Sequence, residues 1–353
     1  MSARLSSEVI EVENDPAAIY RLSLEQQWGD GVPLLPPTDE SVHAMLAATP
    51  RAAADIVVDD LPPRHGTATV ELCAVNAVMA GCEPRAFPLV LAALEAIGRP
   101  GFNGFGLSTT TGPVAPMVVV NGPMRDELAI DYKAGCLGGA AGRGSMTIGR
   151  AVSLCMRNIG GLRAGDSSRT VFGQPARFGL CFGEWEERSP WPSLAERRGF
   201  KPEQEVVTVN GGNGIMPLID VNSESDHDRA YVLGKSIAYP AHSSFDPPAA
   251  APGEVMLLIN PMWAERFGKT FPRIESLQEC LHEAAWQPLD AWPEQRRPGL
   301  IERNRVDARG RVHVVQRPDQ IVPVVCGGLG NLHATLITRW GESEMQSGEV
   351  HRP

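Results

Sequence analysis

The sequence contains none of the short motifs that mark common cofactor and nucleophile sites. It has no C-x-x-C pair, no H-x-H or H-x-x-x-H spacing and no G-x-S-x-G. These absences argue against a dithiol motif local in sequence, a zinc site of the usual spacing and a serine hydrolase elbow. Its Gly-rich stretches match neither G-x-G-x-x-G nor G-x-x-x-x-G-K-[ST], so no nucleotide motif is present.

Positive charge and long apolar runs are also scarce. The 353 residues carry 32 Lys and Arg against 42 Asp and Glu, a net charge of −10. This balance disfavours nucleic acid and anionic membranes as partners. No run reaches the roughly 18 apolar residues of a membrane helix, and residues 1–15 are too polar and acidic for a signal peptide. With seven scattered Cys, the chain is predicted to be a soluble, cytoplasmic protein with reduced thiols.

The composition that is present predicts an α/β fold. Hydrophobic residues make up 43% of the chain, enough for a sizeable core, and 36 Gly and 30 Pro favour many tight turns. We expect a flexible N-terminus over 1–15, an N-terminal half over 16–200 and a C-terminal half over 201–353. The clearest helix is predicted over 146–159, where apolar residues recur at helical spacing before Gly160-Gly161.

A weak internal repeat suggests that the two halves are related. Residues 86–131 and 228–269 each run as a helix, a hydroxyl-rich loop, an apolar strand and an Asn that precedes Pro by one or two positions. The alternative is that this order is a frequent local arrangement. If the repeat is real, Asn121 and Asn260 lie at corresponding strand ends, where open α/β sheets bind their ligands. We therefore predict a composite fold of two halves, with short buried strands and Gly-rich loops.

The most informative stretch is Cys-Phe-Gly-Glu-Trp-Glu-Glu-Arg-Ser-Pro-Trp at 181–191. Its carboxylates, Glu184, Glu186 and Glu187, follow an apolar run and have Trp185 and Trp191 beside them. Buried carboxylates need a cation, an Arg or a proton. At least one of the three is expected to be buried and to face an Arg, a His or a cavity, as a general base or a metal ligand. A structural ion-pair network is the alternative.

A second candidate site is the Gly-rich segment 135–150, which runs into the predicted helix. Backbone N–H groups at a helix N-terminus bind anions, and an Arg adds a bidentate donor. We expect Arg143, Ser145, Thr147 and Arg150 to bind a small anionic substrate. The alternative is that the glycines are there for tight packing.

Among the thiols, Cys326 and Cys136 are the better nucleophile candidates. Cys326 follows the predicted strand 321–325 and precedes Gly327-Gly328, and Cys136 lies in the Gly-rich segment. The histidines with catalytic potential are His227, between two Asp, and His333, after a Gly-rich turn. For each of these residues a packing role is the alternative.

Five segments resemble a family of largely uncharacterised bacterial proteins, some of them loosely labelled thiol-disulfide or thioredoxin-like. The segments are Gly29-Asp-Gly-Val-Pro-Leu-Leu-Pro-Pro-Thr38, Asn76-Ala-Val-Met-Ala-Gly-Cys82, Ala115-Pro-Met-Val-Val-Val-Asn-Gly-Pro123, Thr147-Ile-Gly-Arg150 and Glu184-Trp-Glu-Glu-Arg-Ser-Pro-Trp191. The resemblance implies an enzyme or enzyme subunit of small-molecule metabolism. It also implies a small partner protein with selenocysteine or cysteine in a U/C-G-S-C motif. The chain departs from the family pattern at Gly142-Arg143-Gly144-Ser145.

From these features we predict an enzyme of lyase or hydrolase type that acts on a small anionic substrate. Carboxylates would supply acid–base catalysis or hold a divalent metal, the one cofactor expected here. One alternative is a thiol- or selenol-dependent redox subunit that works with a small partner protein, and another is a non-catalytic binding protein. A second copy of the chain is the other expected partner.

Overall fold

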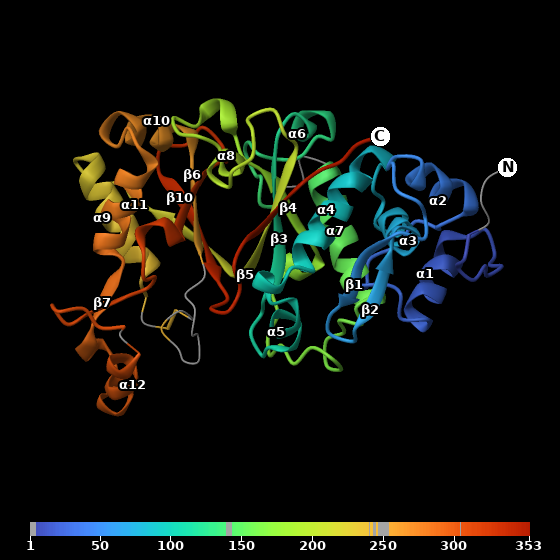
Figure 1. Cartoon of the computed structure of the whole chain (residues 1–353), viewed down its shortest axis with the longest axis horizontal. Coiled ribbons are helices and arrows are strands. Elements are labelled where there is room, and N and C mark those ends of the chain that lie inside the picture. The colour runs from blue at the N-terminus through green and yellow to red at the C-terminus, as the bar shows by residue number, and fades with distance from the viewer. Residues whose placement is uncertain (1–4, 139–142, 240, 243–244, 246–253, 304) are drawn as a thin grey trace.

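The computed structural model describes residues 5–138, 143–239, 241–242, 245, 254–303 and 305–353. Helices and strands alternate around a curled mixed sheet, which confirms the predicted α/β class (Figure 1). The described helices are each too short or too polar to cross a lipid bilayer.

The central sheet contains seven of the described strands. Six of them lie in the order β4-β3-β5-β10-β6-β9, and β11 pairs with β5. Their bounds are β3 (Ala115–Asn121), β4 (Leu180–Gly183), β5 (Val206–Ile219), β6 (Val255–Ile259), β9 (Ile321–Val325), β10 (His333–Arg339) and β11 (Gln346–Glu349). Two small ribbons lie outside it, β1 (Ile56–Leu61) with β2 (Gly66–Thr69) and β7 (Trp286–Pro288) with β8 (Arg311–His313).

The pattern of parallel and antiparallel strand pairs is the same when it is followed inward from either edge of the sheet. β3 is parallel to the edge strand β4 and antiparallel to β5, while β6 is parallel to the edge strand β9 and antiparallel to β10. The antiparallel pair β5–β10 joins the two sets. This is the pairing expected if strands 117–120 and 255–259 are related by an approximate two-fold axis, with Asn121 and Asn260 at corresponding strand ends.

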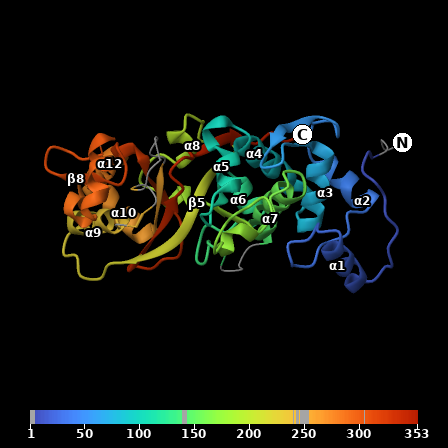
Figure 2. The same cartoon turned by 90° about the horizontal axis from the view of Figure 1, so that it is seen from below.

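The helices cover the outer faces of the two halves. The N-terminal helices are α1 (Pro16–Glu25), α2 (Asp39–Leu46), α3 (Val70–Ala80), α4 (Phe87–Ile97), α5 (Gly104–Thr109), α6 (Met124–Glu127), α7 (Arg143–Asn158) and α8 (Leu194–Arg197). The C-terminal ones are α9 (Asp226–Ile237), α10 (Pro261–Thr270), α11 (Ile274–Ala284) and α12 (Arg297–Glu302). Figure 2 shows α3 and α7 toward one end of the molecule and α9 and α10 toward the other.

Alternation along the strands divides the apolar side chains among three cores. Val118 and Val120 of β3 pack with α3, α4 and α7, whereas Leu257 and Ile259 of β6 pack with α9, α10 and α11. The opposite faces of the same strands form a third core shared by both halves. Its members include Met117, Val119, Phe182, Met256, Leu258, Val324, Cys136 and Cys326.

Two glycines of α7 lie where the helix packs closely against neighbouring backbone. A Cβ on Gly149 would lie 2.6 Å from the Leu180 nitrogen, and one on Gly144 would lie 2.1 Å from the Leu128 oxygen. Both positions therefore need glycine for close backbone approach. The Gly-rich segment thus has a packing role over its described part, which was the alternative to anion binding.

Candidate functional site

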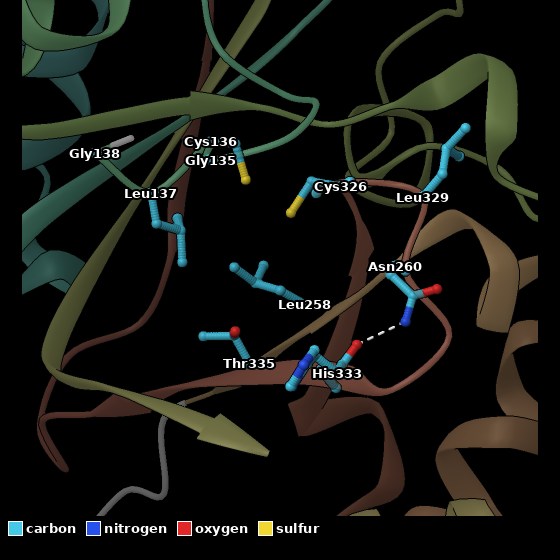
Figure 3. Close-up of a pocket in the computed structure, with 14 residues that line it drawn as sticks. Gly135, Cys136, Leu137, Gly138, Leu258, Asn260, Cys326, Leu329, His333 and Thr335 are labelled. Carbon is cyan, nitrogen blue, oxygen red and sulfur yellow. Dashed lines mark hydrogen bonds between the residues drawn. The ribbon is translucent and has the colours of Figure 1, made fainter. Parts of the chain in front are cut away.

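A cavity of about 740 Å³ opens where the two halves meet. Its lining comes from two Gly-rich segments and from β6 and β10 (Figure 3). The lining residues are Gly135, Cys136, Leu137, Gly138, Leu258, Asn260, Cys326, Gly327, Gly328, Leu329, Gly330, His333, Ala334 and Thr335. The volume is in the range of pockets that hold small molecules, roughly 300–1,000 Å³. Within the described residues, this lining contains no Lys or Arg.

Two cysteines face each other in the wall of this cavity. Cys136 comes from the N-terminal half and Cys326 from the end of β9, and Figure 3 shows their sulfur atoms pointing toward one another. Both residues are buried, at 5% and 3% exposed, and each thiol shifts the pKa of the other. No disulfide links them. The fold therefore assembles a pair of reduced thiols from residues far apart in the sequence.

Backbone hydrogen bonds fix the segments that carry the two thiols. The Gly327 N–H donates to the Tyr132 oxygen at 2.8 Å, which joins the Cys326 turn to the Cys136 segment. The Cys326 N–H donates to the Ile259 oxygen at 3.1 Å and continues the β6–β9 ladder by one residue. Gly327 has a φ of 92°, a left-handed conformation that favours glycine and turns the chain away after Cys326.

The interaction between the two thiols shifts their pKa values in opposite directions. It lowers the pKa of Cys136, with help from the Gly327 N–H, because an S–H donor stabilises a thiolate. The same interaction, together with burial, raises the pKa of Cys326 well above its ordinary value. The thiolate is the nucleophile in thiol chemistry. Cys136 is therefore the better placed of the two to attack a substrate, with Cys326 holding the proton.

Asn260 and His333 form the floor of the cavity beside the thiols. Asn260 Nδ2 donates to the His333 oxygen at 2.6 Å, and Asn260 Oδ1 accepts from the Trp263 N–H at 2.9 Å as the N-cap of α10. Asn260 thereby holds β10 against the start of the helix. The His333 side chain lines the cavity. Of the residues expected at the site, Cys326, Asn260 and His333 come together here.

The acidic cluster forms a separate network around Arg125, which has only 3% of its side chain exposed. Arg125 Nη2 donates to Glu187 Oε1 at 2.6 Å, and its Nε lies 3.4 Å from Glu186 Oε1. Arg125 also donates to the backbone oxygens of Gly122 and Glu184. One carboxylate is thus buried and the others face an Arg, as predicted. This cluster does not line the cavity within the described residues.

Glu184 is the buried member of the cluster, at 1% exposed. Its Oε2 accepts from Asn121 Nδ2 and from the Leu194 N–H, both at 2.7 Å. Its Oε1 lies 3.9 Å from Arg197. Burial raises the pKa of Glu184, although Arg197 and the hydrogen bonds partly offset this effect. Asn121 is consequently a hydrogen-bond partner of Glu184 and does not line the cavity.

Three of the residues expected to bind an anion, Arg150, Ser145 and Thr147, do not line the cavity. Arg150 pairs with Asp30 at 2.8 Å and donates to the Val32 and Pro33 oxygens, so it holds the Gly29–Thr38 segment. Ser145 Oγ accepts from the Asp131 N–H at 2.7 Å, and Thr147 Oγ1 donates to the Gly144 oxygen at 3.4 Å. Arg143 begins α7, but its side chain and residues 139–142 lie outside the described residues.

His227 lies on α9, where its ring packs edge-on against Phe271 with 4.8 Å between centroids. It does not line the cavity. Among the described residues, no three His, Cys, Asp or Glu side chains gather in an arrangement that could hold a metal ion.

Cys136 completes the thiol pair that its sequence context hinted at but could not establish. The signal was that Cys136 and Cys326 each adjoin a glycine.

Comparisons with protein-family models, with curated proteins and with solved structures each found no match.

Proposed function

We propose that this protein is a dithiol oxidoreductase whose reactive pair is Cys136 and Cys326. The observation that carries the proposal is the juxtaposition of these two thiols, one from each half, in the wall of a cavity large enough for a small molecule. Disulfide exchange needs one thiolate to attack and a second thiol to resolve the mixed disulfide. The arrangement supports both roles.

The reaction would proceed in two exchange steps. The Cys136 thiolate attacks one sulfur of a substrate disulfide, forms a mixed disulfide and releases the other sulfur as a thiolate, which takes a proton from water. Cys326 then loses its proton and attacks the Cys136 sulfur. This second step releases the remaining substrate thiolate and leaves a Cys136–Cys326 disulfide. Two electrons pass from the protein to the substrate.

A second dithiol must return those electrons. The small partner protein implied by the sequence resemblance, with its selenol or thiol pair, has the chemistry for this step. It would attack the Cys136–Cys326 disulfide, restore both thiols and leave as a disulfide or selenenyl sulfide. The substrate is expected to be uncharged near its disulfide, since the described lining of the cavity contains no Lys or Arg.

The geometry gives less support to the lyase or hydrolase chemistry. That chemistry needs a carboxylate that faces the substrate, whereas Glu186 and Glu187 pair with Arg125 and Glu184 is bonded to Asn121 and to α8. The redox alternative uses groups that already line the cavity.

The test is a single turnover with bis(2-hydroxyethyl) disulfide, an uncharged substrate. Reduced wild-type protein, freed of excess reductant, should release two thiols and end with both cysteines oxidised. Cys136→Ser should release none, and Cys326→Ser should stop at a mixed disulfide on Cys136. Cys280→Ser is the matched control, because Cys280 is half-buried on α11, outside the cavity lining. Thiol release by Cys136→Ser at the wild-type level would refute the proposal.

A further inference from the structure

Glu184 and Cys326 hold corresponding positions in the two halves. The register pairs Val120 with Gly183 and Ile259 with Val325, so Glu184 and Cys326 are the next residues of the two edge strands. Each continues its ladder by one hydrogen bond, from the Glu184 N–H to Val120 and from the Cys326 N–H to Ile259. Because side chains alternate, Glu184 follows Leu180 and Phe182 toward the core that contains Cys326.

The two edges of the sheet meet at this point. The Trp185 N–H donates to the Val325 oxygen at 2.6 Å, so the peptide group after Glu184 contacts the peptide group before Cys326. Arg197, beside Glu184, reaches the same strand and donates to the Pro323 oxygen at 2.6 Å. Glu184 and Cys326 thus flank one backbone hydrogen bond between the two edge strands, and the alternation of side chains directs both toward the same core.

Half of the Glu184 carboxylate lacks a hydrogen-bond donor among the described residues. Oε2 accepts two hydrogen bonds, whereas Oε1 is buried with no hydrogen-bond partner and has only Arg197 nearby, at 3.9 Å. Buried acceptors are usually satisfied, so an orphan oxygen indicates a role beyond packing. The other charged group that acts on Glu184 is Glu186.

The groups that act on the thiols are few. Cys326 faces Cys136 and the charge of Glu184, and both disfavour a thiolate at Cys326. Cys136 faces Cys326, Asp131 and the Gly327 N–H, and the hydrogen bonds outweigh the charge of Asp131. A negative charge close to one member of a coupled pair moves the shared proton toward that member.

We propose that Glu184 is a positioning residue of the dithiol: its carboxylate acts together with burial and with the facing thiol to keep the pair's proton on Cys326, so that Cys136 attacks first. The inference rests on the proposed function, because an order of attack has meaning only if the pair exchanges with disulfides. Glu184 would thereby connect the acidic cluster to the thiol pair, although the cluster does not line the cavity.

The test compares Glu184→Gln with the matched control Glu187→Gln, whose side chain is 60% exposed. Reduced proteins are labelled with a limiting amount of iodoacetamide from pH 5 to 9, and the label on Cys136 and Cys326 is quantified by peptide mapping. Wild type and Glu187→Gln should label mainly Cys136. In Glu184→Gln the share on Cys326 should rise by about three- to tenfold, since one pKa unit changes a thiolate ratio about tenfold.

The outcomes separate the two proposals. An unchanged labelling ratio and pH profile in a folded Glu184→Gln protein would overturn the role of Glu184 alone. If neither thiol reacts faster than Cys280 in wild type, the dithiol function itself fails.

A second measurement uses folded wild type and needs no Glu184 variant to be stable. The carboxyl carbon of Glu184, followed by carbon-13 NMR, should show a second step at alkaline pH when Cys326 ionises. This step should be missing in Cys326→Ser. A Glu184 signal that does not respond to alkaline pH in wild type would overturn the inference.

Discussion

Replacement of Arg125 by Ala should destabilise the protein strongly. Arg125 is almost fully buried and donates to the Gly122 oxygen at 2.9 Å and to the Glu184 oxygen, which joins α6 to the segment after β4. It also stacks on Tyr132, with its guanidinium carbon 4.8 Å from the ring centroid. Ala would remove all of these contacts at once.

The magnitude follows mainly from the two backbone oxygens. A buried acceptor left without a donor costs about 1–3 kcal/mol. The pairs with Glu186 and Glu187 add less, since Glu187 is well exposed and its ion pair is screened by solvent. We expect a total loss of about 3–5 kcal/mol, the range for removal of one partner from a buried charge network. Arg125→Lys keeps the charge without the planar fork and should lose less than Arg125→Ala.

Urea unfolding followed by circular dichroism measures this loss as a change in the free energy of unfolding. The matched control is Arg188→Ala in the same segment, since Arg188 is more exposed and lies 3.8 Å from Glu265. Its change should stay within about 0.5 kcal/mol. An Arg125→Ala loss no larger than that of Arg188→Ala would refute the reasoning that Arg125 holds the acidic cluster in place.

Three further changes test other contacts. Gly149→Ala should destabilise the protein by about 3 kcal/mol, because its Cβ would lie 2.6 Å from a β4 backbone nitrogen. Gly299→Ala is the control and should be neutral or slightly stabilising, because the space around Gly299 in α12 is open. Thermal melting compares the two variants. Asp30→Asn should lower stability at neutral pH, and its deficit should vanish on acidification. Burial alone would raise the Asp30 pKa, but hydrogen bonds from the half-buried Arg150 lower it below 3.8. The stabilisation is therefore present above that pH and is lost as the pH falls through the folded value. Glu184→Gln should gain stability relative to wild type as the pH rises above 4.5, measured by urea titration. The pKa of Glu184 is raised in the folded state, so folded wild type binds this proton more tightly than the unfolded chain does. Ionisation of Glu184 therefore destabilises wild type and has no counterpart in the Gln variant.

Local patterns predicted the elements of this fold well. The strand over 321–325 was expected at its observed bounds, and the helix over 146–159 overlaps α7, which starts three residues earlier. These segments have strong periodicity or a short apolar run between turn residues, so local information decides them. The strands β3 and β6 were also expected from a local pattern, the repeated strand–Asn–Pro order at their ends.

The candidate site was harder to predict, because it depends on which strands become neighbours. Cys136 and Cys326 are brought together by the β6–β9 pairing and by the hydrogen bond from Gly327 to Tyr132, which no spacing in the sequence encodes. The acidic cluster was easier, since flanking Trp residues indicated burial. Its partner Arg125 could not be identified, because a buried carboxylate shows the need for a cation without showing where the cation lies in the chain.

The measurement that tests the central claim most directly is a disulfide map of the gently oxidised protein. The reduced protein is treated with one equivalent of a disulfide, blocked under denaturing conditions, digested without reductant and analysed by mass spectrometry. A crosslinked peptide containing Cys136 and Cys326, reversed by a small dithiol, is the predicted result. If both cysteines remain alkylated as free thiols while the substrate disulfide is consumed elsewhere, the pair is structural and the proposed redox function is wrong.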